Sequence, residues 1–406
     1  MTIDDLRHGV KLTHSATVRT VMRLQAAGLV EKHSGEDGRS VYLRLSPKGR
    51  RDMARVQKLR ERILEAALAD LSQAELRQFG AIAARVLPNI VPANVSVDAI
   101  CRLCDGKVIA WTHGTWGVAE RCAPSLSANF FAATPALADM VARGYVVVAP
   151  DYPGLGSAMP HPYLVIEDTG RSVLDAVRAA RAIPGAASGT RFAVWGESQG
   201  GHAALATGAL ARRYAPELSL VGTAAAAPPT DLRANFSQGS DANVRAMLTA
   251  FTTYSWSQHF GASLSTVFKP AQRGIVTRLA QNNCIELGAT PRLGTILGVA
   301  SVKAALKGKD LGRIAPWAAI MRSNSIDPRL DIGPMLIAQS VDDPIVAPSV
   351  TRAFAKRACR ERRRLRFVSI PGGDHGNSAR NSATETLAWI DARFAGTLAP
   401  SDCGSI

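Results

Sequence analysis

The chain has 406 residues, 47% of them apolar and 20% charged, and its 48 basic and 33 acidic residues give a net charge of +15. A chain of this length is expected to form two domains, or one large and one small, with a sizeable core. The composition is that of a globular protein, and no apolar run approaches the roughly 18 residues of a membrane span, which excludes a membrane-embedded chain. The positive charge is compatible with a polyanion or an anionic surface as partner but does not locate the contact.

The N-terminal residues 1–20 are polar and mixed in charge, and they lack the apolar run and cleavage site of a secretory signal. We therefore expect a cytoplasmic protein. Its six cysteines are scattered, and only Cys101 and Cys104 have a metal-like spacing, without a second pair nearby. The sequence therefore predicts neither a zinc site nor any other metal or cofactor.

Residues 1–90 form the first predicted domain, because their charged helical texture gives way near Pro88 to apolar runs punctuated by glycine and proline. Helical patterns over 4–10 and 14–27, joined by a short turn, predict a helix-turn-helix. A hairpin with its tip at 35–40 follows. This order of elements is typical of a small winged-helix domain.

Four motifs in this segment are LTHSATV at 12–18, AAGLV at 26–30, DGR at 37–39 and LSPKGR at 45–50. With them, the segment resembles the winged-helix module of MarR-type regulators. In such modules the second helix enters the major groove of DNA and a wing arginine reaches the backbone or the minor groove. The resemblance implies that the DNA contacts are His14, Ser15, Thr17, Arg19 and Arg39.

MarR proteins begin with helices that build the dimer, whereas this chain begins within the helix-turn-helix, so we interpret the module as truncated at its N-terminus. A homodimer would then have to form through the helices at about 50–88. In the alternative interpretation, the small domain packs against the rest of the chain or against a partner and binds no DNA.

Beyond residue 90, short apolar runs alternate with amphipathic helical stretches. The apolar runs lie at 108–111, 145–148, 192–195, 220–222, 335–338 and 365–368. Such alternation predicts an α/β fold, with a mostly parallel sheet wrapped by helices. The interval 232–330 interrupts the alternation and has the pattern of several helices without strands, which is typical of a helical cap or lid. The α/β core is therefore predicted in two parts, 91–231 and 331–406.

The clearest chemical motif is GESQG at 196–200, between the apolar run RFAVW at 191–195 and an alanine-rich helical start. Its glycines allow a strand to turn sharply into a helix while Ser198 lies exposed at the apex, near the helix N-terminus. This context predicts Ser198 as a nucleophile. The alternative is a glycine-rich turn with an idle serine.

A serine nucleophile needs a histidine base, and that base needs a carboxylate that orients it. His375 lies just beyond a predicted strand and is the predicted base. Asp343 is the preferred acid, because the pattern Asp-x-x-Val places the carboxylate in the turn after the preceding strand. Asp342 is the first alternative, and Asp374 is less favoured because a carboxylate next to its own histidine in sequence rarely orients it.

Acyl transfer also needs hydrogen-bond donors for the oxyanion of the tetrahedral intermediate. The backbone N–H of Gln199, directly after the nucleophile, is one candidate. The loop that follows the run at 108–111 supplies the second, with Thr115 as the preferred donor. His113 in the same loop is expected to shape the loop rather than to act as the base.

Seven short motifs beyond residue 107 are considered jointly: HGT at 113–115, CAPS at 122–125, DYPGLG at 151–156, GESQG at 196–200, PPTDL at 228–232, DPIV at 343–346 and DHG at 374–376. With these motifs the chain resembles the secretory lipase family, a branch of the α/β-hydrolases.

The resemblance implies an α/β-hydrolase fold with an inserted helical cap that forms the acyl pocket, and a triad of Ser198, Asp343 and His375. It also implies disulfides between Cys122 and Cys284 and between Cys359 and Cys403. In a reducing cytoplasm, however, free buried thiols are the expected state.

The sequence therefore predicts a serine hydrolase that cleaves carboxylic esters of acyl or lipid substrates through an acyl-enzyme on Ser198. The alternative is a MarR-type DNA-binding regulator whose hydrolase domain is a sensor or inactive. The expected partners are the ester substrate, double-stranded DNA at residues 1–90, and a second copy of the chain.

Overall fold

The computed structural model of the chain describes residues 14–34, 41–52, 55, 72, 75, 106–183, 186, 188–285, 291–372 and 375–406. The chain divides into two compact units, Met1–Arg85 and Val86–Ile406. Within the described residues, no helix is long and apolar enough to cross a membrane. The following predicted features lie outside the described residues: the wing residue Arg39, the pair Cys101 and Cys104, the alternative acid Asp374, and most of the dimer segment 50–88.

The first unit contains helix α2 (His14–Ala26) and an antiparallel hairpin of β1 (Val30–Ser34) and β2 (Val41–Leu45). Gly28 adopts a φ of +68° directly after the helix, a left-handed conformation that glycine tolerates without strain. The chain can therefore turn from the helix into β1 within a few residues.

The predicted DNA contact at Thr17 is wrong, because this side chain is fully buried. Thr17 lies four residues before Val21, which is also buried, so the two side chains share the inward face of α2. A residue on this face does not reach a base or a phosphate. Arg19 is exposed on the same helix, and His14 and Ser15 lie in its first turn.

The second unit is built on a six-stranded sheet with the order β4-β3-β5-β6-β7-β8, in which each neighbouring pair is parallel. The strands are β3 (Gly106–Thr112), β4 (Val146–Val148), β5 (Ser188–Glu197), β6 (Ser219–Ala226), β7 (Met335–Ser340) and β8 (Leu365–Ile370). Each of the six apolar runs in the sequence contributes to one of these strands. The predicted parallel sheet is thereby confirmed.

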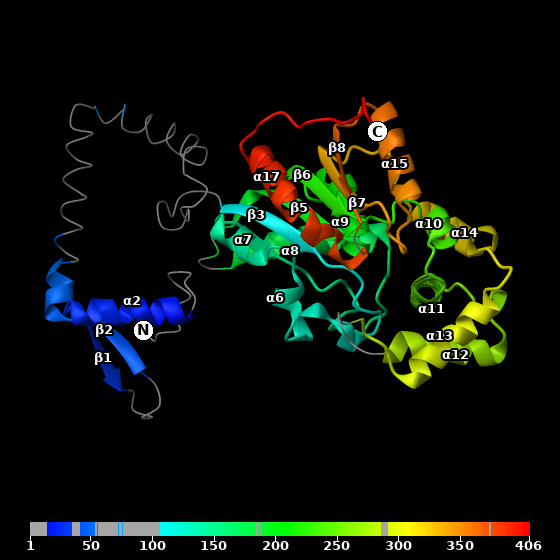
Figure 1. The fold of residues 1–406 in the computed structure, drawn as a ribbon, viewed down its shortest axis with the longest axis horizontal. Helices are drawn as coiled ribbons and strands as arrows, with labels where there is room; N and C mark the ends of the chain where they lie inside the picture. The colour runs from blue at the N-terminus through cyan, green and yellow to red at the C-terminus, as the bar shows by residue number, and fades with distance from the viewer. Residues whose placement is uncertain are drawn as a thin grey trace. The chain divides into compact units, whose positions relative to one another are not determined.

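Helices cover both faces of the sheet (Figure 1). Alternate residues of a strand point to opposite faces, so an apolar strand presents side chains to the helices on each side. Val108 and Ala110 of β3 pack in a cluster with α8 (Ile166–Ala182) and α9 (Gln199–Tyr214). Ile109 and Trp111 of the same strand pack in a cluster with α17 (Ala383–Phe394). A strand buried on both faces needs an apolar residue at every position, which explains the continuous apolar runs. The remaining helices of the core are α6 (Phe130–Ala133), α7 (Leu137–Ala142), α15 (Pro348–Arg360) and α16 (Ser378–Asn381).

A helical segment between β6 and β7, called here the insertion (residues 232–330), is built around a buried apolar cluster that also includes Val118 and residues 163–165. Its helices are α10 (Leu232–Gln238), α11 (Ala242–His259), α12 (Pro270–Asn282), α13 (Leu293–Ala305) and α14 (Trp317–Ser323). Phe251, Trp256, Val276 and Trp317 are buried together within it. No strand occurs in the described residues of this interval, and the helices lie to one side of the sheet, beyond β7 and α9 (Figure 1).

Two disulfides join distant parts of the second unit, Cys122 with Cys284 and Cys359 with Cys403. The first links the segment after β3 to the insertion, where Ile285 N–H also donates to the Trp116 carbonyl at 2.8 Å. The expectation of free thiols in these four cysteines is therefore wrong, because the fold brings each pair within bonding distance. The pairs are those that the family resemblance implies.

Candidate active site

Ser198 lies at the sharp turn between the end of β5 and the start of α9, with φ of 56° and ψ of −120°. A non-glycine residue rarely adopts a positive φ, so this backbone conformation is strained. The turn needs glycines on both sides, because a Cβ at Gly196 would lie 1.8 Å from Thr112 Oγ1 and a Cβ at Gly200 1.9 Å from the Thr112 carbonyl oxygen. The GxSxG pattern is thus a requirement of close backbone packing against β3.

His375 lies directly beside Ser198. It begins a short 3-10 helix after β8, and its Nε2 is 2.7 Å from Ser198 Oγ. On the other side of the ring, His375 Nδ1 is 2.8 Å from Asp343 Oδ2. Since a carboxylate only accepts, Nδ1 carries the proton and Nε2 is free to accept the serine proton. The three residues come from loops after β5, β7 and β8, at one edge of the sheet.

Several hydrogen-bond donors hold the Asp343 carboxylate in place. Its side chain is fully buried, and its Oδ1 accepts from the backbone N–H groups of Ile345 at 2.8 Å and Val346 at 2.9 Å. Gln339 Nε2 donates to Oδ2 at 3.0 Å. Burial by itself raises the pKa of Asp343, but His375 and the two backbone donors outweigh it and lower this pKa below the ordinary value. The neighbouring Asp342 is exposed to solvent and does not take this position.

The loop after β3 also lies against Ser198. A Cβ built on Gly114 would lie 3.5 Å from the Glu197 carbonyl oxygen and 3.9 Å from Ser198 Cβ, which places the loop within van der Waals range of the turn at Ser198. The Thr115 hydroxyl, one residue on, is 2.8 Å from the hydroxyl of Tyr163. Gln199, the other predicted oxyanion donor, is buried at the first position of α9. Both predicted donors thus lie in segments that adjoin Ser198.

His113 is buried and forms hydrogen bonds that hold this loop in shape. Its ring lies 4.1 Å from that of Tyr152, and its Nδ1–H donates to the Gly114 carbonyl at 2.7 Å. The Tyr152 hydroxyl donates to the His113 carbonyl at 3.0 Å. Burial lowers the pKa of His113 to about 4, so the ring is neutral near pH 7. His113 therefore shapes the loop, in agreement with its expected role.

The sequence did not single out His161 or Tyr163, although both contact predicted site residues. Gln199 Nε2 donates to His161 Nε2 at 3.0 Å, and His161 Nδ1–H donates to the Pro153 carbonyl at 2.8 Å. Burial lowers the pKa of His161 to about 3. This neutral ring can accept from Gln199 only in the tautomer that carries its proton on Nδ1.

Residues 161–163 also attach to the insertion. Ser255 of α11 donates to the His161 carbonyl and accepts from the Tyr163 backbone N–H at 2.9 Å. Trp256 Nε1, on the same helix, donates to the Tyr163 carbonyl at 2.8 Å. One short segment therefore contacts Gln199, Thr115 and the insertion at once. No local pattern in the sequence signals these contacts, because their partners are distant along the chain.

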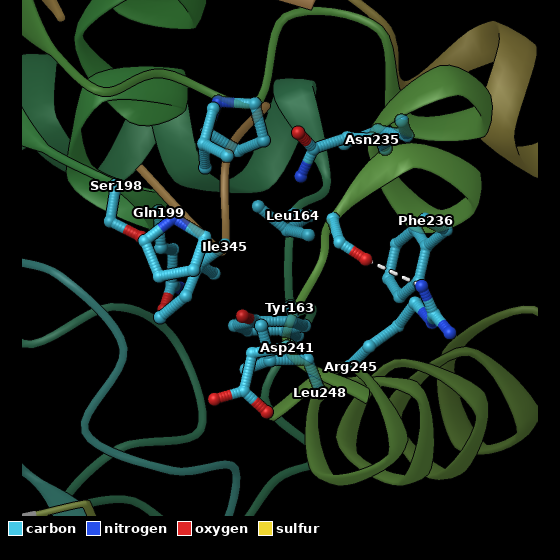
Figure 2. A pocket seen from close by; sticks show the side chains of 15 residues that line it. Tyr163, Leu164, Ser198, Gln199, Asn235, Phe236, Asp241, Arg245, Leu248 and Ile345 are labelled. Atoms are coloured by element: carbon cyan, nitrogen blue, oxygen red, sulfur yellow. Dashed lines mark hydrogen bonds between the residues drawn. The ribbon is translucent and has the colours of Figure 1, made fainter. Parts of the chain in front are cut away.

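A cavity opens on Ser198 between the core and the insertion (Figure 2). Its lining residues are Tyr163, Leu164, Ser198, Gln199, Pro229, Leu232, Asn235, Phe236, Gly239, Asp241, Arg245, Leu248, Pro344, Ile345 and Val346. The volume is about 40 Å³, and α10 and α11 form its wall on the side of the insertion. Within the described residues, no group of three or more metal-ligating side chains gathers here or elsewhere.

Comparison with known proteins agrees with this arrangement. A family model described as secretory lipase matches residues 127–402. Lipase A from Candida antarctica in its closed state has a TM-score of 0.58 at 20% identity, over 74% of this chain and 73% of that chain. Esterase LipA of Xanthomonas oryzae has a TM-score of 0.51 at 20% identity, over 72% and 81% of the two chains. At these identities the likeness shows the α/β-hydrolase-like fold.

The curated relatives are lipases of fungi and bacteria. The chain is 26% identical to Lipase 5 of Candida albicans over 66% of this chain and 59% of that protein, so it spans less than two thirds of that relative. A secreted triacylglycerol lipase of Malassezia globosa is 24% identical over 77% of this chain and 70% of that protein. A Mycobacterium tuberculosis relative, 26% identical over 78% and 71%, is named "Probable inactive lipase".

These comparisons give no support to a MarR-type regulator, to DNA as a partner or to a homodimer. They also overturn the expected cytoplasmic location, because the matched family is that of secretory lipases and the Malassezia relative is a secreted enzyme. The finding points to an extracellular protein. The two disulfides agree with this correction, since disulfides persist in oxidising compartments.

The fold, the geometry around Ser198 and the family match refer to the same part of the chain. The match covers 127–402, which includes Ser198, Asp343 and His375. The chain belongs to the secretory lipase family.

Proposed function

We propose that this chain hydrolyses carboxylic esters of acyl or lipid substrates through an acyl-enzyme formed on Ser198. The series of hydrogen bonds from Asp343 through His375 to Ser198, at 2.8 Å and 2.7 Å, is the observation that carries the proposal. A serine hydroxyl is a weak nucleophile unless an oriented base removes its proton, and this arrangement provides such a base. The relatives named as lipases support an ester as the substrate class.

In the proposed reaction, His375 Nε2 accepts the proton of Ser198 Oγ while this oxygen attacks the ester carbonyl carbon. Asp343 keeps the ring oriented and stabilises its positive charge. The oxyanion accepts hydrogen bonds from the Gln199 backbone N–H and from Thr115. His375 then donates its proton to the leaving alcohol, and a water molecule, activated by the same base, releases the carboxylic acid from Ser198.

We further infer that the insertion, residues 232–330, acts as a cap over a core formed by 91–231 and 331–406. Leu232, Phe236 and Leu248 present apolar surface to the cavity beside Ser198, which suits an acyl chain. Because α10 and α11 form the wall of this narrow cavity of about 40 Å³, we expect them to move when an acyl chain enters.

The test is covalent labelling of the purified chain by a fluorophosphonate probe, together with hydrolysis of p-nitrophenyl esters of graded acyl length. We expect labelling and turnover in the parent chain, loss of both in Ser198→Ala, and no change in Ser265→Ala, which alters an exposed serine of the insertion. Absence of labelling in a folded parent chain would refute the proposal and would place this chain with its relative named as inactive.

A further inference from the structure

A second, much larger cavity lies on the insertion, next to the one that opens on Ser198. We call it the basic groove, and its volume is about 810 Å³. It is lined by Phe236, Ser237, Ala242, Asn243, Arg245, Ala246, Thr249, Ala300, Lys303, Ala304, Leu306, Lys307, Gly308, Lys309, Asp310 and Leu311. Phe236 and Arg245 line both cavities, so the two spaces share a wall. Figure 2 shows these two side chains on the side of the smaller cavity away from Ser198.

The charges in the basic groove are mostly positive and lack acidic partners. Lys303, Lys307 and Lys309 are exposed, and no ion pair joins them or Arg245 to a carboxylate in the part of the chain that the structure describes. The only acid in the lining, Asp310, pairs with Arg313 at 3.2 Å and caps a 3-10 helix through Gly312 N–H.

The hydrogen bonds of these cations leave donors unused. Lys303 Nζ donates to Asn243 Oδ1 at 3.3 Å, Lys309 Nζ donates to the Val267 carbonyl, and Arg245 Nη1 donates to the Gly239 carbonyl. An ammonium group has three N–H donors and a guanidinium has five, so each retains donors for a ligand. Alanines and leucines from α11, α13 and the segment after it add apolar surface to the groove, beside the polar Ser237, Asn243 and Thr249.

We propose that the basic groove binds the phosphate group of a phosphate-bearing acyl ester, a phospholipid-like substrate whose ester carbonyl reaches Ser198. The proposal rests on the proposed function and names its substrate class. Four cations without acidic partners in the groove favour a doubly charged phosphate monoester over a singly charged carboxylate, and lysine binds phosphate as a point charge. The apolar surface of the groove suits the glycerol and acyl parts of an amphiphile.

In this arrangement the substrate passes the shared wall at Phe236 and Arg245, with its phosphate in the basic groove and its ester at Ser198. Hydrolysis breaks the ester bond between the acyl carbon and the alcohol oxygen. Water supplies the hydroxyl of the released carboxylic acid and the proton of the released alcohol, and the phosphate stays on that alcohol. No further reactant is needed.

The test uses the full chain and monomeric dihexanoyl substrates below their critical micelle concentration, so that attraction to a charged lipid surface does not contribute. The substrates are a dihexanoyl glycerol phosphate, the matching phosphatidylcholine and the neutral dihexanoyl glycerol. Lys303→Glu with Lys307→Glu reverses two charges of the basic groove. Lys356→Glu with Arg360→Glu, exposed on α15, is the matched control.

We expect the groove variant to lower kcat/KM for the phosphate monoester by roughly 10- to 100-fold, because hydrogen bonds to charged groups are lost. The phosphatidylcholine should lose less, and the neutral ester should change by less than about twofold, as should every substrate in the control variant. An equal loss for the neutral ester, or no loss for the phosphate ester, overturns the proposal.

If no ester is hydrolysed, the proposed function fails, and the basic groove is then tested by calorimetric binding of the same phosphate monoester to the full chain. Binding that the groove variant weakens supports the groove independently of catalysis, whereas unchanged or absent binding overturns it. Hexanoate as competitor separates the two anion classes, since displacement at equal concentration would assign the groove to carboxylates.

Discussion

The edge of the sheet and the insertion contribute to the same cavity in different ways. At the sheet edge, Ser198, Asp343 and His375 follow the parallel strands β5, β7 and β8, and His375 is joined to each of the other two by a hydrogen bond shorter than 3 Å. On the insertion, helices packed around a buried apolar cluster leave a cavity of about 40 Å³ and a groove of about 810 Å³. Strand pairing thus holds the three residues that we propose as catalytic, whereas side-chain packing of the insertion sets the size of the cavity beside them. Almost any substitution of Ser198, Asp343 or His375 should abolish activity, whereas many substitutions in the insertion should leave activity largely intact.

The largest effect should follow from Asp343→Asn. An amide in place of the carboxylate can donate to His375 Nδ1 and favour the wrong tautomer, so kcat should fall by roughly 10⁴-fold. Steady-state hydrolysis of p-nitrophenyl butyrate measures this kcat. Asp342→Asn is the matched control, because Asp342 is adjacent in sequence but exposed, and it should change kcat by less than about twofold. Similar losses in both variants would contradict the assignment of Asp343.

The second large effect should be a loss of stability in acid, because three buried histidines are neutral in the folded chain. Burial lowers the pKa of His113 to about 4, of His161 to about 3 and of His202 to about 4. Between about pH 6.5 and pH 4 the unfolded chain binds protons at these rings and the folded chain does not. The free energy of unfolding should therefore fall by roughly several kcal/mol between pH 7 and pH 4, at about 1.4 kcal/mol per pKa unit.

Urea unfolding at several pH values measures this slope through tryptophan fluorescence, since all six tryptophans lie beyond residue 105. His161→Gln should flatten the slope, because glutamine does not titrate in this range. If the slope in His161→Gln equals that of the parent chain, protonation of His161 does not contribute to the loss of stability in acid.

The two disulfides allow a matched comparison of the two regions. Cys122–Cys284 ties the insertion to the segment after β3, whereas Cys359–Cys403 lies within the core. Replacing either pair by serine should lower the free energy of unfolding by about 2–4 kcal/mol. Only the first replacement should also raise the rate of fluorophosphonate labelling, because it frees the insertion, whose displacement admits the probe to Ser198. Equal labelling rates would mean that the insertion is held in place by packing alone.

The smallest effect should come from the segment that joins the two regions. Tyr163→Phe removes the hydroxyl that contacts Thr115 Oγ1 at 2.8 Å. Loss of one neutral hydrogen bond corresponds to roughly 0.5–1.5 kcal/mol, so kcat should fall by about two- to tenfold while KM stays the same. Tyr254→Phe on α11 is the control, since its hydroxyl contacts only the exposed Gln281 among the described residues. A change in KM alone would assign Tyr163 to substrate binding.

The sequence predicted much of the sheet and of the site around it, because those signals are local. Buried parallel strands need continuous apolar runs, and the turn at Ser198 needs Gly196 and Gly200 for the close approach to β3. Thr17 shows where such reasoning failed. Its place on a helix was predicted correctly, but the face of that helix depends on what packs against it.

By itself, the sequence determined the six strands and the sharp turn at Ser198, since backbone conformation and alternation are encoded by neighbouring residues. Only the tertiary structure decided which aspartate meets His375, which cysteines pair, and how His161 and Tyr163 hold Gln199 and Thr115. It also decided the sizes of the two cavities. These features depend on contacts between residues tens to hundreds of positions apart, and such distances are set by packing rather than by local pattern.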